Sequence, residues 1–179
     1  MTAPVMLIPL KCVRCGTPVP ARPGEVAWRC AQCGQGLLLD EVQGVRPLEI
    51  HFAAGVAPGV PRRPFWVADG QAALQRVTYS SFGKQTEAAQ QFWSAPRRFF
   101  VPAFEGTLDA LLDVGAGLLQ RPVALQEGDP VEFAPVVLLP RDIAALAEFI
   151  VVAIEAERKD KIKQVDFALQ LSEAALWIL

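Results

Sequence analysis

The sequence predicts an α+β protein with a small metal-binding β-module at its amino terminus. All four cysteines of the chain fall within residues 12–33, in two Cys-x-x-Cys-Gly motifs. The rest of the chain mixes short segments of alternating apolar residues with longer segments of helical spacing. At 179 residues, 52% of them hydrophobic and 20% charged, the chain is long enough for one ordinary domain beside the module.

The cysteine spacing is typical of a tetrahedral metal site. Two residues between paired cysteines let both thiolates reach one ion, at about 2.3 Å for zinc. A glycine follows each pair, at Gly16 and Gly34, where a positive φ angle turns backbone N–H groups toward the sulfurs. Four thiolates fill a tetrahedral site and leave no position for substrate or activated water. The predicted metal ligands are Cys12, Cys15, Cys30 and Cys33.

The segments around the motifs predict a β-hairpin and a further strand. Pro23-Gly24 is a turn signal, Val26–Trp28 leads a strand into the second motif, and Gly36–Asp40 is an apolar third strand. In these features the chain resembles the zinc-ribbon superfamily over residues 8–42. The resemblance implies that the four cysteines bind a structural Zn²⁺. It implies little about activity, because zinc ribbons occur in transcription factors, polymerase subunits, ribosomal proteins, enzymes and scaffolds.

Three alternatives to zinc were weighed. Rubredoxin-like iron sites use similar motifs, so iron remains the alternative ion. Disulfides within Cys-x-x-Cys pairs would close strained rings. A redox-active motif would need a βαβ context, and the sequence has none after either cysteine pair.

The predicted domain organisation is a zinc ribbon over residues 1–43 and an α+β domain over 44–179, with a mainly antiparallel sheet and two principal helices. An alternating pattern predicts a strand over 48–52, and further strands are expected over 97–104 and 131–139 and in the tail 165–179. The apolar tail is expected to pack within the chain, with the edge of a symmetric dimer as the alternative. Asp69-Gly70 predicts a type I′ turn in a hairpin over 65–79.

Three segments predict helices. Residues 86–94 suit a short helix that ends before Pro96. Thr107 is a suitable N-cap for a helix that Pro122 closes. The second principal helix is expected from Pro140 to about residue 161, with Glu155 on its surface paired to Lys159.

Residues typical of catalysis are few. His51 is the single histidine, and Glu49 lies two residues before it on the same strand face. A polar strand face explains this pair more simply than an acid/base site. The chain contains neither a G-x-S-x-G motif nor a phosphate-binding loop, and the metal leaves no free cysteine. The sequence therefore favours a protein that is not an enzyme.

A stretch of arginines and aromatic residues is the best candidate for a surface that binds nucleic acid or a partner. Arginines interleaved with aromatic rings can hold phosphates and stack bases. The alternative is aromatic residues in the core with arginines at the surface, and the isoelectric point near 5.5 favours it. The candidate residues are Arg62, Arg63, Trp66, Trp93, Arg97 and Arg98.

Together these features predict a zinc-ribbon protein whose second domain is a non-catalytic interaction or scaffold module that binds protein partners or itself. The alternative is a nucleic-acid-associated factor in transcription or replication. The sequence contains no run of 18 apolar residues, so no transmembrane segment is expected. Reduced cysteines and the absence of a signal-like amino terminus predict a cytoplasmic location.

Overall fold

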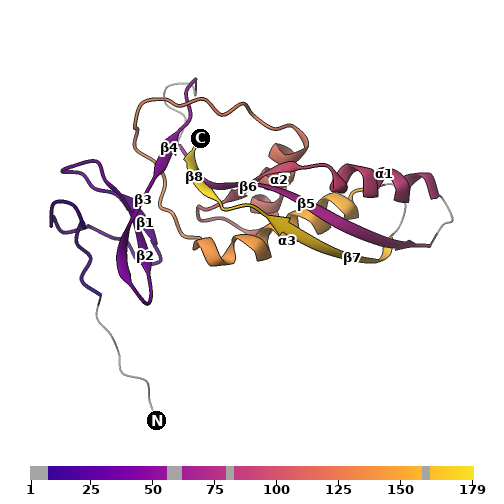
Figure 1. The fold of residues 1–179 in the computed structure, drawn as a ribbon, viewed down its shortest axis with the longest axis horizontal. Coiled ribbons are helices and arrows are strands. Elements are labelled where there is room, and N and C mark those ends of the chain that lie inside the picture. Colours follow the sequence, from indigo (N-terminus) through magenta and orange to yellow (C-terminus); the bar gives the residue numbers. More distant parts are fainter. Residues whose placement is uncertain (1–7, 56–61, 80–82, 159–161) are drawn as a thin grey trace, which may run out of the picture.

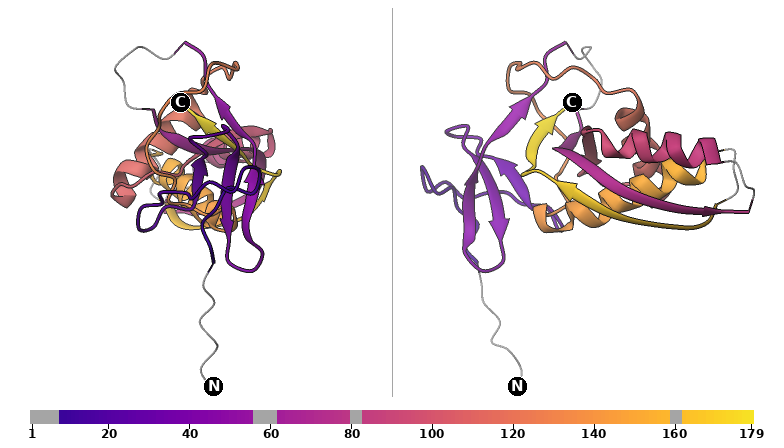
Figure 2. Two further views of the ribbon diagram at one scale, coloured as in Figure 1. Left: turned by 90° about the vertical axis from the view of Figure 1, so that its left-hand side faces the viewer. Right: turned by 45° about the vertical axis from the view of Figure 1, so that its right-hand side comes forward.

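The computed structural model describes residues 8–55, 62–79, 83–158 and 162–179, and it confirms the α+β class. Three strands near the amino terminus form one sheet, and five strands from the rest of the chain form another. Figures 1 and 2 show the small sheet at one end of the molecule and the large sheet with its helices at the other. We refer to residues 8–48 as the ribbon and to the described residues from Ile50 onward as the body.

The ribbon sheet consists of β1 (Ala27–Arg29), β2 (Gly36–Asp40) and β3 (Gly44–Leu48), paired antiparallel in this order. β2 is the third strand that the sequence predicts. β3 pairs with β2 along its whole length, from Leu48 opposite Gly36 to Gly44 opposite Asp40. The sheet therefore continues past residue 43, where the domain boundary is expected.

The strand predicted over residues 48–52 is wrong as a single element, because it is divided between the two sheets. β3 ends at Leu48, whereas β4 (Ile50–Phe52) pairs in parallel with β8 (Ala175–Ile178) of the body. The alternating pattern cannot reveal the division, since both pieces alternate with the same period.

The longest strand of the body is β5 (Pro64–Thr78), with 15 residues, so the hairpin predicted over 65–79 is wrong. Gly70 lies within the strand and is not among the glycines with positive φ. A Cβ at this position would lie 2.5 Å from Leu171 Cδ2 and 2.9 Å from the Gln170 carbonyl oxygen. The glycine thus permits the close approach of a neighbouring strand, which is its other common role in a sheet.

β5 has one partner on one edge and two on the other. β6 (Arg97–Pro102) pairs antiparallel with the first half of β5 and ends the sheet order, as the proline at its end predicts. On the opposite edge, β8 pairs with the start of β5 and β7 (Ile162–Leu171) with the remainder. Ser172, the first of the three residues between β7 and β8, donates its N–H to the Asp69 carbonyl oxygen at 2.8 Å.

Three α-helices accompany the large sheet. α1 (Gly83–Ser94) and α2 (Leu108–Gln120) confirm two predicted helices, and the Thr107 side chain caps α2 by accepting the Ala110 N–H at 3.4 Å. The 3₁₀ turn η1 (Pro140–Asp142) leads into α3 (Ile143–Ala156). α3 confirms the third helix but ends earlier than predicted.

The helices, the sheet and one long loop enclose the main core. Gly115 lets α2 approach α3 closely, since a Cβ there would lie 2.5 Å from Ile150 Cδ1. Leu176 and Ile178 of β8 are fully buried, which confirms that the apolar tail packs within the chain. The largest fully buried side chains of this core include Trp66, Trp93, Phe99, Ile150, Leu176 and Ile178.

The strand predicted over residues 131–139 is wrong. This segment belongs to the loop between α2 and η1, and its strand-like pairing is one isolated bridge between Val136 and Ala27. Val136 is fully buried at this bridge. The apolar residues of the segment therefore join the ribbon to the body instead of forming a ladder.

Candidate metal centre

Each cysteine pair lies in a tight turn closed by the backbone. The Gly16 N–H donates to the Cys12 carbonyl oxygen, and the Gly34 N–H to the Cys30 carbonyl oxygen, both at 2.9 Å. The two glycines have φ angles of 73° and 74°, as the sequence predicts. A side chain would strain both turns, because L-residues rarely adopt this conformation.

The turns bring the four sulfur atoms together. Cys12 Sγ lies 3.6 Å from Cys33 Sγ, and Cys15 Sγ lies 3.6 Å from Cys30 Sγ. All four sulfurs lie within 4.8 Å of one another. Sulfurs about 2.3 Å from a central zinc ion form a tetrahedron with edges of about 3.8 Å, so the spacing fits a four-thiolate metal site. It is too long for disulfide bonds, which are about 2.05 Å.

The surroundings of the cluster shift the pKa values of Cys15 and Cys33 in opposite directions. The side chain and backbone N–H of Thr17 stabilise the Cys15 thiolate and lower the pKa of Cys15 to about 6. At Cys33 the Gln35 N–H favours the thiolate, but desolvation and the neighbouring thiols outweigh it and raise the pKa to about 11. Thiolates this close repel one another, and a divalent cation among them would remove that repulsion.

The ribbon sheet presents one face to the cysteines and the other to the body. Trp28 and Leu37 are directly opposite each other on β1 and β2, and both pack with Cys12 and Cys30. The next pair, Ala27 and Leu38, points the other way and belongs to the main core. Because side chains alternate along each strand, the sheet lies between the cysteine cluster on one face and the body on the other.

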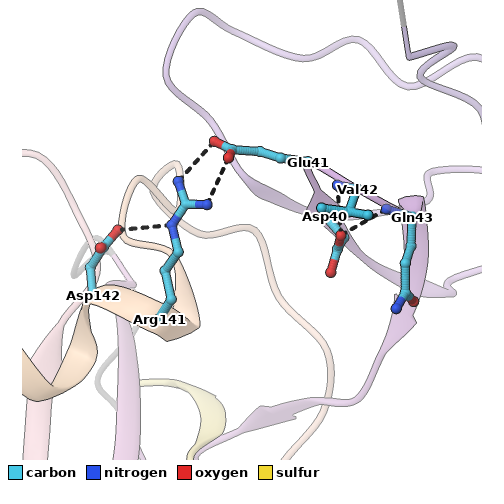
Figure 3. A network of polar contacts seen from close by, with 6 residues as sticks. All are labelled: Asp40, Glu41, Val42, Gln43, Arg141 and Asp142. Carbon is cyan, nitrogen blue, oxygen red and sulfur yellow. Dashed lines mark hydrogen bonds and ion pairs between the residues drawn. The ribbon is translucent and has the colours of Figure 1, made fainter. Parts of the chain in front are cut away.

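Polar contacts hold the ribbon on the body (Figure 3). The Arg141 guanidinium donates to both carboxylate oxygens of Glu41, at 2.7 and 2.8 Å. Asp40 accepts the N–H groups of Val42 and Gln43 and so fixes the turn that carries Glu41. Nearby, the Val26 N–H donates to the Val136 carbonyl oxygen at 2.7 Å.

The residues of the predicted arginine-rich surface lie in different environments. Trp66 and Trp93 are buried, with exposed fractions of 1% and 0%, so neither ring is available to stack on a base. Arg98 is exposed and forms an ion pair with Asp69 at 2.9 Å. Arg97 covers the Phe92 ring at 3.8 Å, Arg63 lies 5.0 Å from the Phe104 ring, and Arg62 donates to the Ala53 carbonyl oxygen at 3.3 Å.

His51 contacts residues far from it in the sequence. Its Nδ1 lies 2.5 Å from Glu127 Oε1, and its ring stacks on Trp177 with centroids 4.8 Å apart. Glu127 belongs to the loop after α2, which is also bound to the strand end by the Gly128 N–H donating to the Phe52 carbonyl oxygen at 2.6 Å. The histidine therefore helps to attach this loop to β4.

A buried charged cluster in the body was missed at the sequence level. Glu155, expected at the surface, is fully buried and lies 2.8 Å from Arg76 Nε, whose side chain is also fully buried. This Arg76 contact is an ion pair without good hydrogen-bond geometry. Glu155 also accepts from Trp93 Nε1 and Arg158 Nε, both at 2.7 Å. The expected partner Lys159 lies outside the described residues, and Arg76 stands in an alternating strand that gave no signal of a long-range ion pair.

The chain matches no protein-family model, no curated protein and no solved structure. None of the helices in the described residues combines the length and apolar character needed to cross a membrane. The geometry of the cysteine cluster is therefore the firmest basis for a function.

Proposed function

We propose that Cys12, Cys15, Cys30 and Cys33 bind a structural Zn²⁺ that folds the ribbon, and that the ribbon and the body together form a protein-interaction scaffold. The convergence of four thiol sulfurs within 4.8 Å carries this proposal. Neutral imidazole or carboxylate ligands are absent from the set, and an all-sulfur tetrahedron favours zinc or iron over harder ions. With four protein ligands, the ion has a structural role.

The surroundings of the cysteines support a role in folding. The cluster that contains them buries Cys12, Trp28, Cys30 and Leu37, so half of its buried residues are metal-ligand candidates. A module of about 40 residues rarely buries enough apolar surface to fold alone. Zinc binding in comparable peptides contributes about 10–16 kcal/mol, which becomes folding free energy.

We propose a scaffold role because the described residues bring together no set of side chains arranged for acid/base or nucleophilic catalysis. His51 and Glu127 are the nearest approach to an acid/base pair, but their contact attaches a loop to β4, and the His51 ring stacks on Trp177. The nucleic-acid alternative has less support, because Trp66 and Trp93 lie in the core.

Metal analysis of the purified chain tests the first half of the proposal. We expect one zinc per chain, with X-ray absorption showing four sulfur neighbours at about 2.3 Å. Bound iron with the same ligands would contradict the choice of ion, and a metal-free folded ribbon would contradict the site itself.

Affinity capture from the source cells tests the second half. The wild-type and Cys30→Ser chains serve as matched baits, and we expect specific protein partners that the variant loses. Identical captured proteins for both baits, or nucleic acid that elutes with salt, would contradict the scaffold role.

A further inference from the structure

β7 is one of the outer strands of the large sheet, together with β4 and β6. One edge of β5 carries β8 and then β7. β8 is covered in turn by β4, whereas no strand of the described residues pairs with the far side of β7. Figures 1 and 2 both show β7 at the margin of the molecule.

β7 carries a lysine, Lys163, and an irregularity at its start, but from Gln164 onward it lacks the features that usually prevent strands from pairing between molecules. Proteins protect sheet edges with prolines, lysines, bulges or very short strands. β7 has ten residues, and its irregularity lies at its start, opposite Val77 and Thr78. From Gln164 to Leu171 the strand contains neither proline, glycine nor a basic residue, and Asp166 is its one charge. Eight residues, about 27 Å of backbone, are thus available for pairing.

The side chains of β7 alternate in a way that suits an added strand. Val165, Phe167, Leu169 and Leu171 are only half-buried against the core, because the sheet ends beside them. Asp166, Ala168 and Gln170 are exposed on the opposite face. A further strand would accept the backbone hydrogen bonds of the edge and cover the remaining apolar surface.

We infer that β7 pairs antiparallel with β7 of a second copy, so that the large sheet continues across a two-fold axis. The inference rests on the proposed scaffold role and names one partner for it. Residues directly opposite in an antiparallel pair lie on the same face, so apolar residues must meet apolar residues. With Ala168 on the axis, Phe167 faces Leu169 of the second copy and Val165 faces Leu171 of the second copy.

The same register also gives the charged side chain of Asp166 a polar partner. Asp166 then lies opposite Gln170 of the second copy, which can donate a hydrogen bond to it, and no like charges face each other. A shift that places Phe167 on the axis would instead put Lys163 opposite an apolar residue of the other chain. The β7 sequence is therefore self-complementary in the Ala168-centred register.

Sedimentation equilibrium on the full zinc-loaded chain tests this inference. We expect a monomer–dimer equilibrium for the wild type. Ala168→Asp places two carboxylates opposite each other at the axis and should weaken the dimer at least about ten-fold. The matched control is Ala73→Asp, because Ala73 is exposed and lies directly opposite Ala168 on β5, one strand inside the edge. This control should leave dimerisation unchanged.

Mixing variants provides a second readout that a folding defect would not produce. Chains carrying Ala168→Asp and Ala168→Lys should each be monomeric alone and should form a heterodimer together. A wild type that is monomeric up to millimolar concentration, equal effects of the two Asp variants, or an edge occupied by an unrelated polypeptide would each overturn the inference. Zinc content measured on the same samples separates the two proposals, since a zinc-loaded monomer would contradict only the β7 pairing.

Discussion

The ribbon and the body bury their apolar residues by different means. The buried cluster of the ribbon has Cys12, Trp28, Cys30 and Leu37 at its centre, so it is organised around sulfur atoms. The body encloses a core of large apolar side chains between a sheet and helices, and its charged cluster is neutralised within the protein. One region thus gathers four cysteines that could bind a metal ion, whereas the other pairs its buried charges within the protein.

This difference shows how a small module can be attached to a larger one. Ala27 and Leu38 of the ribbon belong to the core of the body, and Val136 of the body forms a β-bridge with Ala27 of β1. The ribbon therefore contributes one apolar face to the body, whereas its other face packs against Cys12 and Cys30. Perturbing each region separately should reveal how far the two depend on each other.

Loss of the metal should have the largest effect. We expect a strong chelator, or Cys30→Ser, to unfold the ribbon, because binding energy of about 10–16 kcal/mol is then lost. The body should remain folded with a melting temperature lower by a few degrees, since Val136 loses its cover. Amide hydrogen exchange resolved by residue measures both effects. Val13→Ser, at an exposed position in the other cysteine turn, is the matched control and should retain protection in β1 and β2.

Removing the buried charge of the body should have the next largest effect. Glu155→Gln keeps the shape of the side chain but removes the negative charge beside the buried Arg76, which should cost about 3–5 kcal/mol in the free energy of unfolding. Denaturant titration of the zinc-loaded protein measures this. Glu148→Gln on the exposed face of α3 is the control, with an expected change below about 0.5 kcal/mol. Equal effects of the two substitutions would show that the ion pair does not stabilise the body.

Two tryptophans allow the regions to be compared by the same substitution. Trp93 Nε1 donates to Glu155, whereas Trp28 Nε1 is buried and has no hydrogen-bond partner among the described residues. Trp93→Phe removes the indole N–H that donates to the buried Glu155 carboxylate, whereas Trp28→Phe removes an indole N–H that has no acceptor in the described part of the chain. We therefore expect Trp93→Phe to lower the free energy of unfolding by about 1–2 kcal/mol more than Trp28→Phe. Thermal unfolding with excess zinc measures the difference, and the reverse order would contradict this account.

The features that the sequence predicts well are those determined by near neighbours. Cysteine spacing, the glycines after each pair and the Thr107 cap all act within a few residues, and the sequence shows them directly. Asp69-Gly70 is the instructive failure, because its meaning depends on Leu171, about a hundred residues away. The prediction for Glu155 fails for the same reason, since no neighbouring residue in the sequence indicates its ion pair with Arg76. Attachment of the ribbon sheet to the body likewise depends on Val136, in a segment that resembles an ordinary strand.

The joint between the two regions should show the smallest effect. The hydrogen bonds from Arg141, and then its charge, hold the pKa of Glu41 below its ordinary value of 4.5. A lowered carboxyl pKa stabilises the folded state above pH 4.5, and that contribution is lost as the pH falls through the lowered pKa. Between pH 6 and 8 the pair should therefore stay ionised. We expect Glu41→Gln to speed exchange of the Val26 amide, whose hydrogen bond to Val136 crosses the same joint, by less than about five-fold, equally at pH 6 and pH 8.

The joint's charge dependence can be separated from any change in shape. Both side chains are exposed, so 1 M salt should screen the pair and abolish the difference between wild type and Glu41→Gln. Exchanging the charges, with Glu41→Arg and Arg141→Glu in one chain, should restore much of the protection that either single substitution removes. If amide hydrogen exchange at Val26 responds neither to salt nor to the double substitution, the ion pair does not stabilise the joint. The apolar contacts of Ala27, Leu38 and Val136 would then hold the ribbon on the body.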